Sequence, residues 1–189
     1  MLVMACSGDR TEMARVLLAD SQPPFNEALE VLLSRDDVHR VVGRCSSADG
    51  DEVRTNLCQG LGFSRPDRDT NIARIGYVAA KLANHAVAVL VAAISPYREA
   101  RDQVRALVDS FVEVHVAAPL STCAERDPKG LYAKALAGEI KHFTGVSDPY
   151  EPPVAAEIVL HTEAESVDDS VHLVLAWLED HHLTGPSDR

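Results

Sequence analysis

The stretch "SRPDRDTNIARIGYVAAKLANHAVAVLVAA", Ser64 to Ala93, predicts a helix that is followed directly by a buried strand. Ser64 is expected to cap the helix, with Asp67 three residues later in the first turn. From Ala86 the pattern changes to an unbroken apolar run, which indicates a strand. Before that point, apolar residues recur at helical spacing and should line one face of the helix: Ile72, Ile75, Val78, Ala79 and Leu82.

Four other apolar runs rich in Val, Leu and Ile lie along the chain, separated by helical patterns. Five strands that alternate with helices predict a three-layer α/β fold, in which helices cover both faces of a mainly parallel five-stranded sheet. Ligands of such folds bind beyond the carboxyl ends of the strands. The predicted strands are Arg15–Ala19, His39–Gly43, Ala86–Ala93, Phe111–Val116 and Glu157–Thr162.

A last helix is predicted over "SVDDSVHLVLAWLEDHH", with Ser166 as its cap. The single tryptophan of the chain, Trp177, lies in this helix and is expected to pack against the core. We expect one domain over residues 1–182 and a frayed tail over residues 183–189. The residues predicted to face the core are Val167, Val171, Val174, Leu175 and Leu178.

Length and composition fit one globular domain, with 189 residues of which 46% are hydrophobic and 25% are charged. The longest apolar run, Ala86 to Ile94, has nine residues, whereas a membrane helix needs about 20. The amino-terminal segment has no basic region before a long apolar core, so we expect no signal peptide and a cytoplasmic location. The four cysteines are far apart and form no C-x-x-C pair, which predicts neither disulfides nor a cysteine metal site.

Charge is distributed unevenly along this acidic chain, whose net charge is -11. Such a balance argues against nonspecific binding to nucleic acid, which requires a basic surface. Residues 54 to 141 nevertheless hold 12 of the 18 basic residues and 9 of the 29 acidic ones, a local net charge of +3. A basic middle suits a small anionic ligand, although solvated helix faces would give the same count.

Carboxylates, arginines and an aromatic ring gather in "ADGDEVRTNLCQGLGFSRPDRDTN", Ala48 to Asn71. Together such groups could hold a metal ion, a phosphate and an aromatic base. Each also has an ordinary structural interpretation: a D-x-D pair can cap a helix, and a phenylalanine can pack below its turn. The residues concerned are Asp49, Asp51, Arg54, Phe63, Arg68 and Asn71.

Six segments in fixed order resemble the adenylylsulfate kinase family: "DGDEVR", "LGFSRPDRDTNIARIGYVA", "ISPYR", "DPKGLY", "GEIKHFTGVSDPYE" and "VDDSVHLVLAWL". The likeness covers about Asp49 to Leu178. Enzymes of this family transfer the γ-phosphoryl group of ATP to the 3'-hydroxyl of adenosine 5'-phosphosulfate (APS), giving PAPS in sulfate assimilation. The resemblance implies a P-loop-kinase-like fold, Mg²⁺ with ATP, and a homodimer.

The resemblance also implies roles for residues near the predicted strand ends. Phe63 and Phe143 would sandwich the adenine, and Ile94 would contact the substrate. Asp51 would orient the 3'-hydroxyl or the water shell of Mg²⁺, while Ser95 matches a serine assigned as a phosphoserine intermediate. Ser95 precedes a proline and could instead be a plain helix cap. The phosphosulfate and ribose would be gripped by Arg54, Arg68 and Asn71.

The segment Arg126 to Gly145 would form a mobile lid by the same resemblance. Arg126, Lys129 and Lys141 would bring positive charge over the transferring phosphoryl group, and closure would exclude water. The two lysines could equally be ordinary surface charges.

The front of the chain departs from the family pattern. The family begins with a Walker A loop, G-x-x-x-x-G-K-[ST], whose backbone and lysine hold the ATP phosphates. The first 48 residues here contain two glycines, Gly8 and Gly43, and no lysine. Residues 13–48 instead resemble the start of a response-regulator receiver domain, although Asp20 lacks the second carboxylate of a receiver pair.

Two origins could explain this front: a receiver-like βαβ half joined to the kinase part, or a frameshift in a genuine kinase front. Because the ATP cradle supplies much of the rate in phosphoryl transfer, we expect APS binding with strongly reduced turnover. The alternatives are a non-catalytic APS-binding module and a receiver-like interaction domain.

Overall fold

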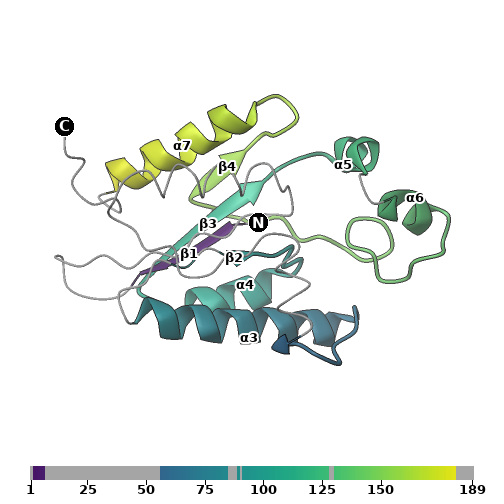
Figure 1. The fold of residues 1–189 in the computed structure, drawn as a ribbon, viewed down its shortest axis with the longest axis horizontal. Helices are drawn as coiled ribbons and strands as arrows, with labels where there is room; N and C mark the ends of the chain where they lie inside the picture. Colours follow the sequence, from purple (N-terminus) through teal and green to yellow (C-terminus); the bar gives the residue numbers. More distant parts are fainter. Residues whose placement is uncertain (1, 7–55, 85–88, 90, 128–129, 182–189) are drawn as a thin grey trace.

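The computed structural model describes residues 2–6, 56–84, 89, 91–127 and 130–181 (Figure 1). These residues form an α/β fold, as predicted. The predicted strands over residues 15–19 and 39–43 lie outside the described residues, together with the whole receiver-like segment 13–48. The same holds for three predicted site residues, Asp51, Arg54 and Lys129.

The described strands form one sheet in the order β2-β1-β3-β4. Strand β3 (Ser110–Val116) pairs in parallel with β4 (Ile158–Leu160), with Val114 opposite Ile158. Strand β1 (Leu2–Cys6) is antiparallel to both β3 and β2 (Val91–Ala92). Strands β2, β3 and β4 therefore share one direction, which confirms the mainly parallel sheet.

Strand β1, which lies between β2 and β3, was not predicted from the sequence. Its register places Val3 opposite Val91 on one side and Glu113 on the other. A five-residue apolar segment has too little periodicity to identify a strand by itself. Its place in the sheet depends on the two strands that flank it.

Helix α3 (Arg65–Ala83) begins where the sequence predicts. The Ser64 hydroxyl accepts a hydrogen bond from the Asp67 amide at 3.4 Å and donates to the Asp67 carboxylate at 2.6 Å. Ile72 and Ala79 are buried, and Ile75 and Leu82 are partly buried, but Val78 is 39% exposed. The prediction for Val78 was wrong because, at about 100° per residue, it falls outside the stripe centred on Ile72.

Helix α4 (Arg98–Arg105) packs closely against α3 at a glycine. A Cβ atom placed on Gly76 would lie 2.5 Å from a methyl carbon of Val104. No side chain fits at this crossing without a shift of one helix, so the glycine sets how near the two helices come.

Helix α7 (Val167–Asp180) begins after the cap predicted at Ser166, and Asp169 reciprocates that cap to form a capping box. Val171, Val174 and Leu178 are buried, while Leu175 and Trp177 are partly buried against the core. Trp177 also stacks on His181 at 3.8 Å. Val167 is 38% exposed, contrary to prediction: it is in line with the buried stripe, but it is the first residue of the helix and precedes the first buried residue, Ser170.

Three layers result, with α3 and α4 on one face of the sheet and α7 on the other (Figure 1). Two short helices, α5 (Leu120–Arg126) and α6 (Leu131–Leu136), project past the carboxyl end of β3. Within the described part of the chain, no helix is long and apolar enough to cross a membrane. The core joins all three layers through Ile72, Val104, Val112, Val114, Ile158, Leu160, Val171 and Val174.

Candidate functional site

The loop before α3 is fastened to the lid segment by Arg68. The Arg68 side chain donates from Nε to the Phe63 carbonyl at 2.9 Å and from Nη2 to the His142 carbonyl at 2.6 Å. Its guanidinium carbon lies 5.5 Å from the centroid of the Phe63 ring. Arg68 is buried, whereas Phe63 is 56% exposed. The structure therefore brings Phe63 and the 142–143 segment together and presents an aromatic ring to solvent.

Four buried polar atoms near these residues have no hydrogen-bond partner among the described residues: Oδ1 of Asp69, Oδ1 of Asn71, Oγ of Ser95 and Oγ1 of Thr144. Two of them belong to predicted site residues: Oδ1 of Asn71, on α3 one turn after Arg68, and Oγ of Ser95, at the carboxyl end of β2. A buried polar atom without a partner costs free energy, and such atoms are uncommon in folded proteins. Both atoms could hydrogen-bond to a bound polar ligand.

The turn that carries Ser95 also exposes a predicted contact residue, Ile94, which is 42% exposed. Ser95 is buried and has a φ of 37°, a left-handed value that is uncommon outside glycine. Next to it, the buried Tyr97 ring lies under the Arg65 guanidinium at 4.5 Å. Burial raises the pKa of Tyr97, so the phenol stays neutral at ordinary pH.

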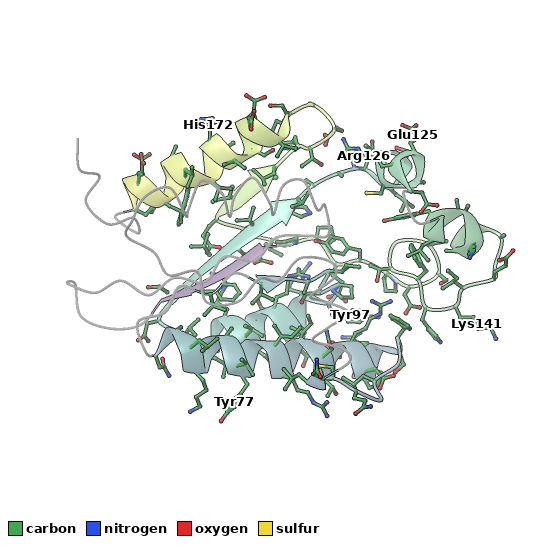
Figure 2. All side chains as sticks on the ribbon, viewed as in Figure 1. Tyr77, Tyr97, Glu125, Arg126, Lys141 and His172 are labelled. Carbon is green, nitrogen blue, oxygen red and sulfur yellow. The ribbon has the colours of Figure 1, made fainter. Side chains whose placement is uncertain are left out.

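The two predicted lid cations that the structure describes, Arg126 and Lys141, do not converge. Arg126 donates from Nη2 to the Thr162 carbonyl at 2.6 Å, which ties α5 to the loop after β4. Lys141 is exposed and lies at the outer edge of the lid, well away from Arg126 (Figure 2). Phe143 packs edge-on against Tyr132 of α6, with ring centroids 4.9 Å apart. The backbone of His142, next to Phe143, is joined to the Phe63 loop through Arg68.

Asp127 joins the two lid helices and was not singled out by the sequence. Burial favours the neutral form of Asp127, but hydrogen bonds from backbone N–H groups, led by that of Ala133, outweigh burial and hold the pKa of Asp127 below its usual value. The Ala133 amide donates to the Asp127 carboxylate at 3.0 Å. The sequence did contain an indication of this role, because an aspartate just before a short helix often caps that helix.

Buried charges lie next to the site and were also missed. Glu113 interrupts the apolar strand "SFVEVHV" and is buried against Arg101 of α4. A charged residue at an inward-facing strand position is the signal that could have found this pair.

Metal-binding clusters of three or more His, Cys, Asp or Glu are absent from the described ranges, and Asp51 lies outside them. Cys58 is buried and Cys123 is partly buried, with its Sγ 3.9 Å from the Ala118 carbonyl.

Comparison with known proteins agrees with this arrangement. A model of the family described as adenylylsulphate kinase matches residues 26–161. An adenylyl-sulfate kinase of Rippkaea orientalis is 60% identical over 132 residues, which make up 70% of this chain and 73% of that protein. An adenylyl-sulfate kinase of Gloeothece citriformis is 58% identical over 131 residues, with 69% and 74% of the two chains covered.

Solved structures give the same result. The APS kinase CysC of Mycobacterium tuberculosis, in complex with AMPPNP and APS, has a TM-score of 0.75 and 36% identity, over 86% of this chain and 95% of that one. A hexameric APS kinase from Thiobacillus denitrificans has a TM-score of 0.60 and 27% identity, over 86% of this chain and 27% of that one.

The family match begins at residue 26 and so includes part of the segment that we compared with a receiver domain. The receiver likeness, the homodimer and the site roles stay predictions. The fold, the motifs and the relatives agree, and the chain belongs to the adenylylsulphate kinase family of nucleotide-binding transferases.

Proposed function

We propose that the protein binds APS between the loop before α3, the Ser95 turn and the 142–143 segment, and that it is an adenylyl-sulfate kinase with slow turnover. The clamp made by Arg68 is the observation that carries the proposal. It holds the exposed Phe63 ring next to the lid segment, close to Asn71, which has a buried and unpaired oxygen. An adenine that stacks on Phe63 would cover apolar surface that is now exposed to solvent.

Each predicted residue has a defined task in this proposal. Phe63 and Phe143 stack on the adenine, and Ile94 contacts the nucleoside. The Oδ1 atom of Asn71 accepts a hydrogen bond from a ribose hydroxyl. Arg54 and Arg68 bind the charged phosphosulfate. Asp51 and Ser95 act on the 3'-hydroxyl, whose oxygen reacts.

Transfer would proceed in line. The 3'-oxygen of APS forms a bond to the γ-phosphorus as the bond from that phosphorus to the β–γ bridging oxygen breaks, so ADP leaves and the hydroxyl proton passes to Asp51 or water. Mg²⁺ bound with ATP would neutralise the phosphate oxygens, and Asp51 is the residue of this chain proposed to orient its water shell. If closure of the lid released Arg126 from Thr162, the predicted lid cations would also neutralise charge on the phosphate oxygens.

A second candidate function is a binding module for APS without phosphoryl transfer. The two candidates differ in whether the protein binds and uses ATP. The sequence has no G-x-x-x-x-G-K-[ST] motif, and its first lysine is Lys81. That motif supplies backbone donors and a lysine to the β- and γ-phosphates. Its loss should lower turnover by orders of magnitude while leaving the APS pocket unchanged.

Separate calorimetric titrations with APS and with ATP, followed by an assay for PAPS, test the proposal. APS should bind, and Phe63→Ala should weaken APS about 5- to 150-fold, because stacking contributes about 1 to 3 kcal/mol. Tyr77→Ala removes an aromatic ring of similar exposure (58%) on the far part of α3 and serves as the matched control. Binding of both nucleotides with PAPS formed supports the kinase, and APS binding alone supports the module. Absence of APS binding would refute both.

A further inference from the structure

The turn at Ser95 needs support from the residues around it. Ser95 is 2% exposed and its φ of 37° lies in the left-handed region, where a side chain crowds the backbone. The turn connects β2 to α4 and places Ile94 on the surface. A strained conformation of this kind persists only where neighbouring groups hold it.

Arg101 of α4 is the residue that holds the turn. It donates from Nη1 to the Ser95 carbonyl at 3.0 Å and from Nη2 to the Glu151 carbonyl at 2.7 Å. Its Nε lies 2.8 Å from a carboxylate oxygen of Glu113 on β3. The side chain of Arg101 is 1% exposed. One buried guanidinium thus links α4, β3, the Ser95 turn and the segment that follows the lid.

Further bonds join the same two segments. The Glu151 amide donates to the Pro96 carbonyl at 2.8 Å, and the Glu151 carboxylate accepts from the Arg98 amide at 2.9 Å. The Ser95 turn and the segment after the lid therefore form one unit. Arg101 supplies the only described side chain that donates to carbonyl groups of both.

A second arginine balances the charge and does not touch the turn. Arg105 lies 3.2 Å from Glu113 and binds the Glu157 carboxylate through two hydrogen bonds of 2.6 and 3.0 Å. Its side chain is 35% exposed. The group contains two arginines and two glutamates, which offset one another's charge. Arg105 takes part in the same charge group but its described hydrogen bonds go to Glu113 and Glu157 and not to Ser95 or Glu151, so it provides an internal control.

We propose that Arg101 is a positioning residue of the APS site. By binding the carbonyls of Ser95 and Glu151, it fixes the turn that presents Ile94 and Ser95 relative to the chain returning from the lid. The inference rests on the proposed APS-binding function. Arg101 does not reach the substrate itself; it acts through the backbone that carries the contact residues.

The test compares Arg101→Lys with Arg105→Lys. Lysine keeps the positive charge and can still pair with Glu113, but its single ammonium group cannot bond the Ser95 and Glu151 carbonyls in the same fork geometry. Hydrogen exchange at the amides of Arg98 and Glu151 is measured without ligand, the APS Kd by calorimetry, and the unfolding midpoint in urea. Arg101→Lys should speed exchange at both amides and weaken APS, each by about tenfold or more. Arg105→Lys should change the exchange rates and the APS Kd by no more than about twofold, even where its unfolding midpoint falls as much as that of Arg101→Lys.

Several results would overturn the inference. Unchanged exchange and an unchanged Kd in Arg101→Lys would show that the turn does not depend on Arg101. Equal losses in both variants would show a general effect of stability. Faster exchange with an unchanged Kd would refute the positioning role alone, whereas a wild-type chain that does not bind APS would refute the proposed function and the substrate role with it. If Arg101→Lys does not fold, Glu113→Gln removes the charge that orients Arg101 and should produce the same two losses.

Discussion

The Nη2 atom of Arg68 donates a 2.6 Å hydrogen bond to the carbonyl of His142, 74 residues further along the chain. His142 has a φ of 58°, so the lid backbone turns through a left-handed residue at the point where Arg68 binds it. The bond connects the first turn of α3 to the loop that carries Phe143. Arg68 therefore has a structural task that is independent of any contact with phosphosulfate.

Arg68→Lys should weaken APS binding by about tenfold or more. A lysine has a single ammonium group and cannot bond the Phe63 and His142 carbonyls in the same fork geometry. The Phe63 loop and the lid would lose their link, and hydrogen exchange in residues 142–148 should become faster. Arg74→Lys is the matched control, because Arg74 lies on the same helix and binds the Leu57 carbonyl at 3.0 Å, away from the lid. Equal Kd values for the two variants would contradict the clamp.

Gly76→Ala should destabilise the fold by about 1 to 3 kcal/mol through overpacking. The added methyl would lie 2.5 Å from a methyl carbon of Val104, so α3 and α4 would have to separate. Urea unfolding measures the loss. The double variant Gly76→Ala with Val104→Ala should recover part of it, since the contact that crowds the methyl is removed. No coupling between the two substitutions would disprove the close approach.

Helices α3 and α7 could be predicted from the sequence because their signals are local. Ser64 was recognised as a cap by Asp67 three positions later, Ser166 was predicted to cap the last helix, and apolar spacing identified the buried faces. Errors arose at the margins of those faces, at Val78 and Val167, where only contacts with the sheet decide exposure. Strand β3 was also correct, since four of the six residues from Phe111 to Val116 are apolar and only Glu113 and His115 interrupt them.

The candidate site could be predicted only as a set of residue types. The sequence identified Phe63, Arg68 and Asn71, but not that Arg68 binds the His142 carbonyl. The pairing of Arg101 with Glu113 was equally out of reach, because it joins a helix and a strand whose distance depends on the whole fold. Strand β1 was missed for a related reason, as its partners come from far along the chain.

Stability should fall as the medium becomes acidic, in part through Glu157. Burial favours the neutral acid, yet hydrogen bonds from Arg105 and from the Glu113 amide outweigh it and hold the pKa of Glu157 below its ordinary value of 4.5. A carboxylate with a lowered pKa in the folded state stabilises fully above the unfolded pKa, and this contribution disappears as pH falls through the folded pKa. The loss should therefore occur below about pH 4.5.

Urea unfolding between pH 3 and pH 7 measures this contribution. Glu157→Gln should be less stable than wild type at pH 7, and the difference should shrink as the pH falls. Glu125→Gln, at an exposed position on α5, should keep the wild-type pH dependence. A difference between wild type and Glu157→Gln that stays constant over the whole range would exclude the proposed linkage.

Val3→Pro tests the place of β1 inside the sheet. Val3 has a paired strand on each side, with Val91 of β2 and Glu113 of β3 as its partners, so its amide faces a strand whichever way it points. Proline has no amide hydrogen and is confined to edges and bulges of sheets. Losing the bond and leaving its acceptor unpaired should cost about 1 to 3 kcal/mol in urea unfolding. Val3→Ile keeps the amide and the strand preference and should unfold like wild type, whereas unchanged stability of Val3→Pro would show that β1 does not occupy the centre of the sheet.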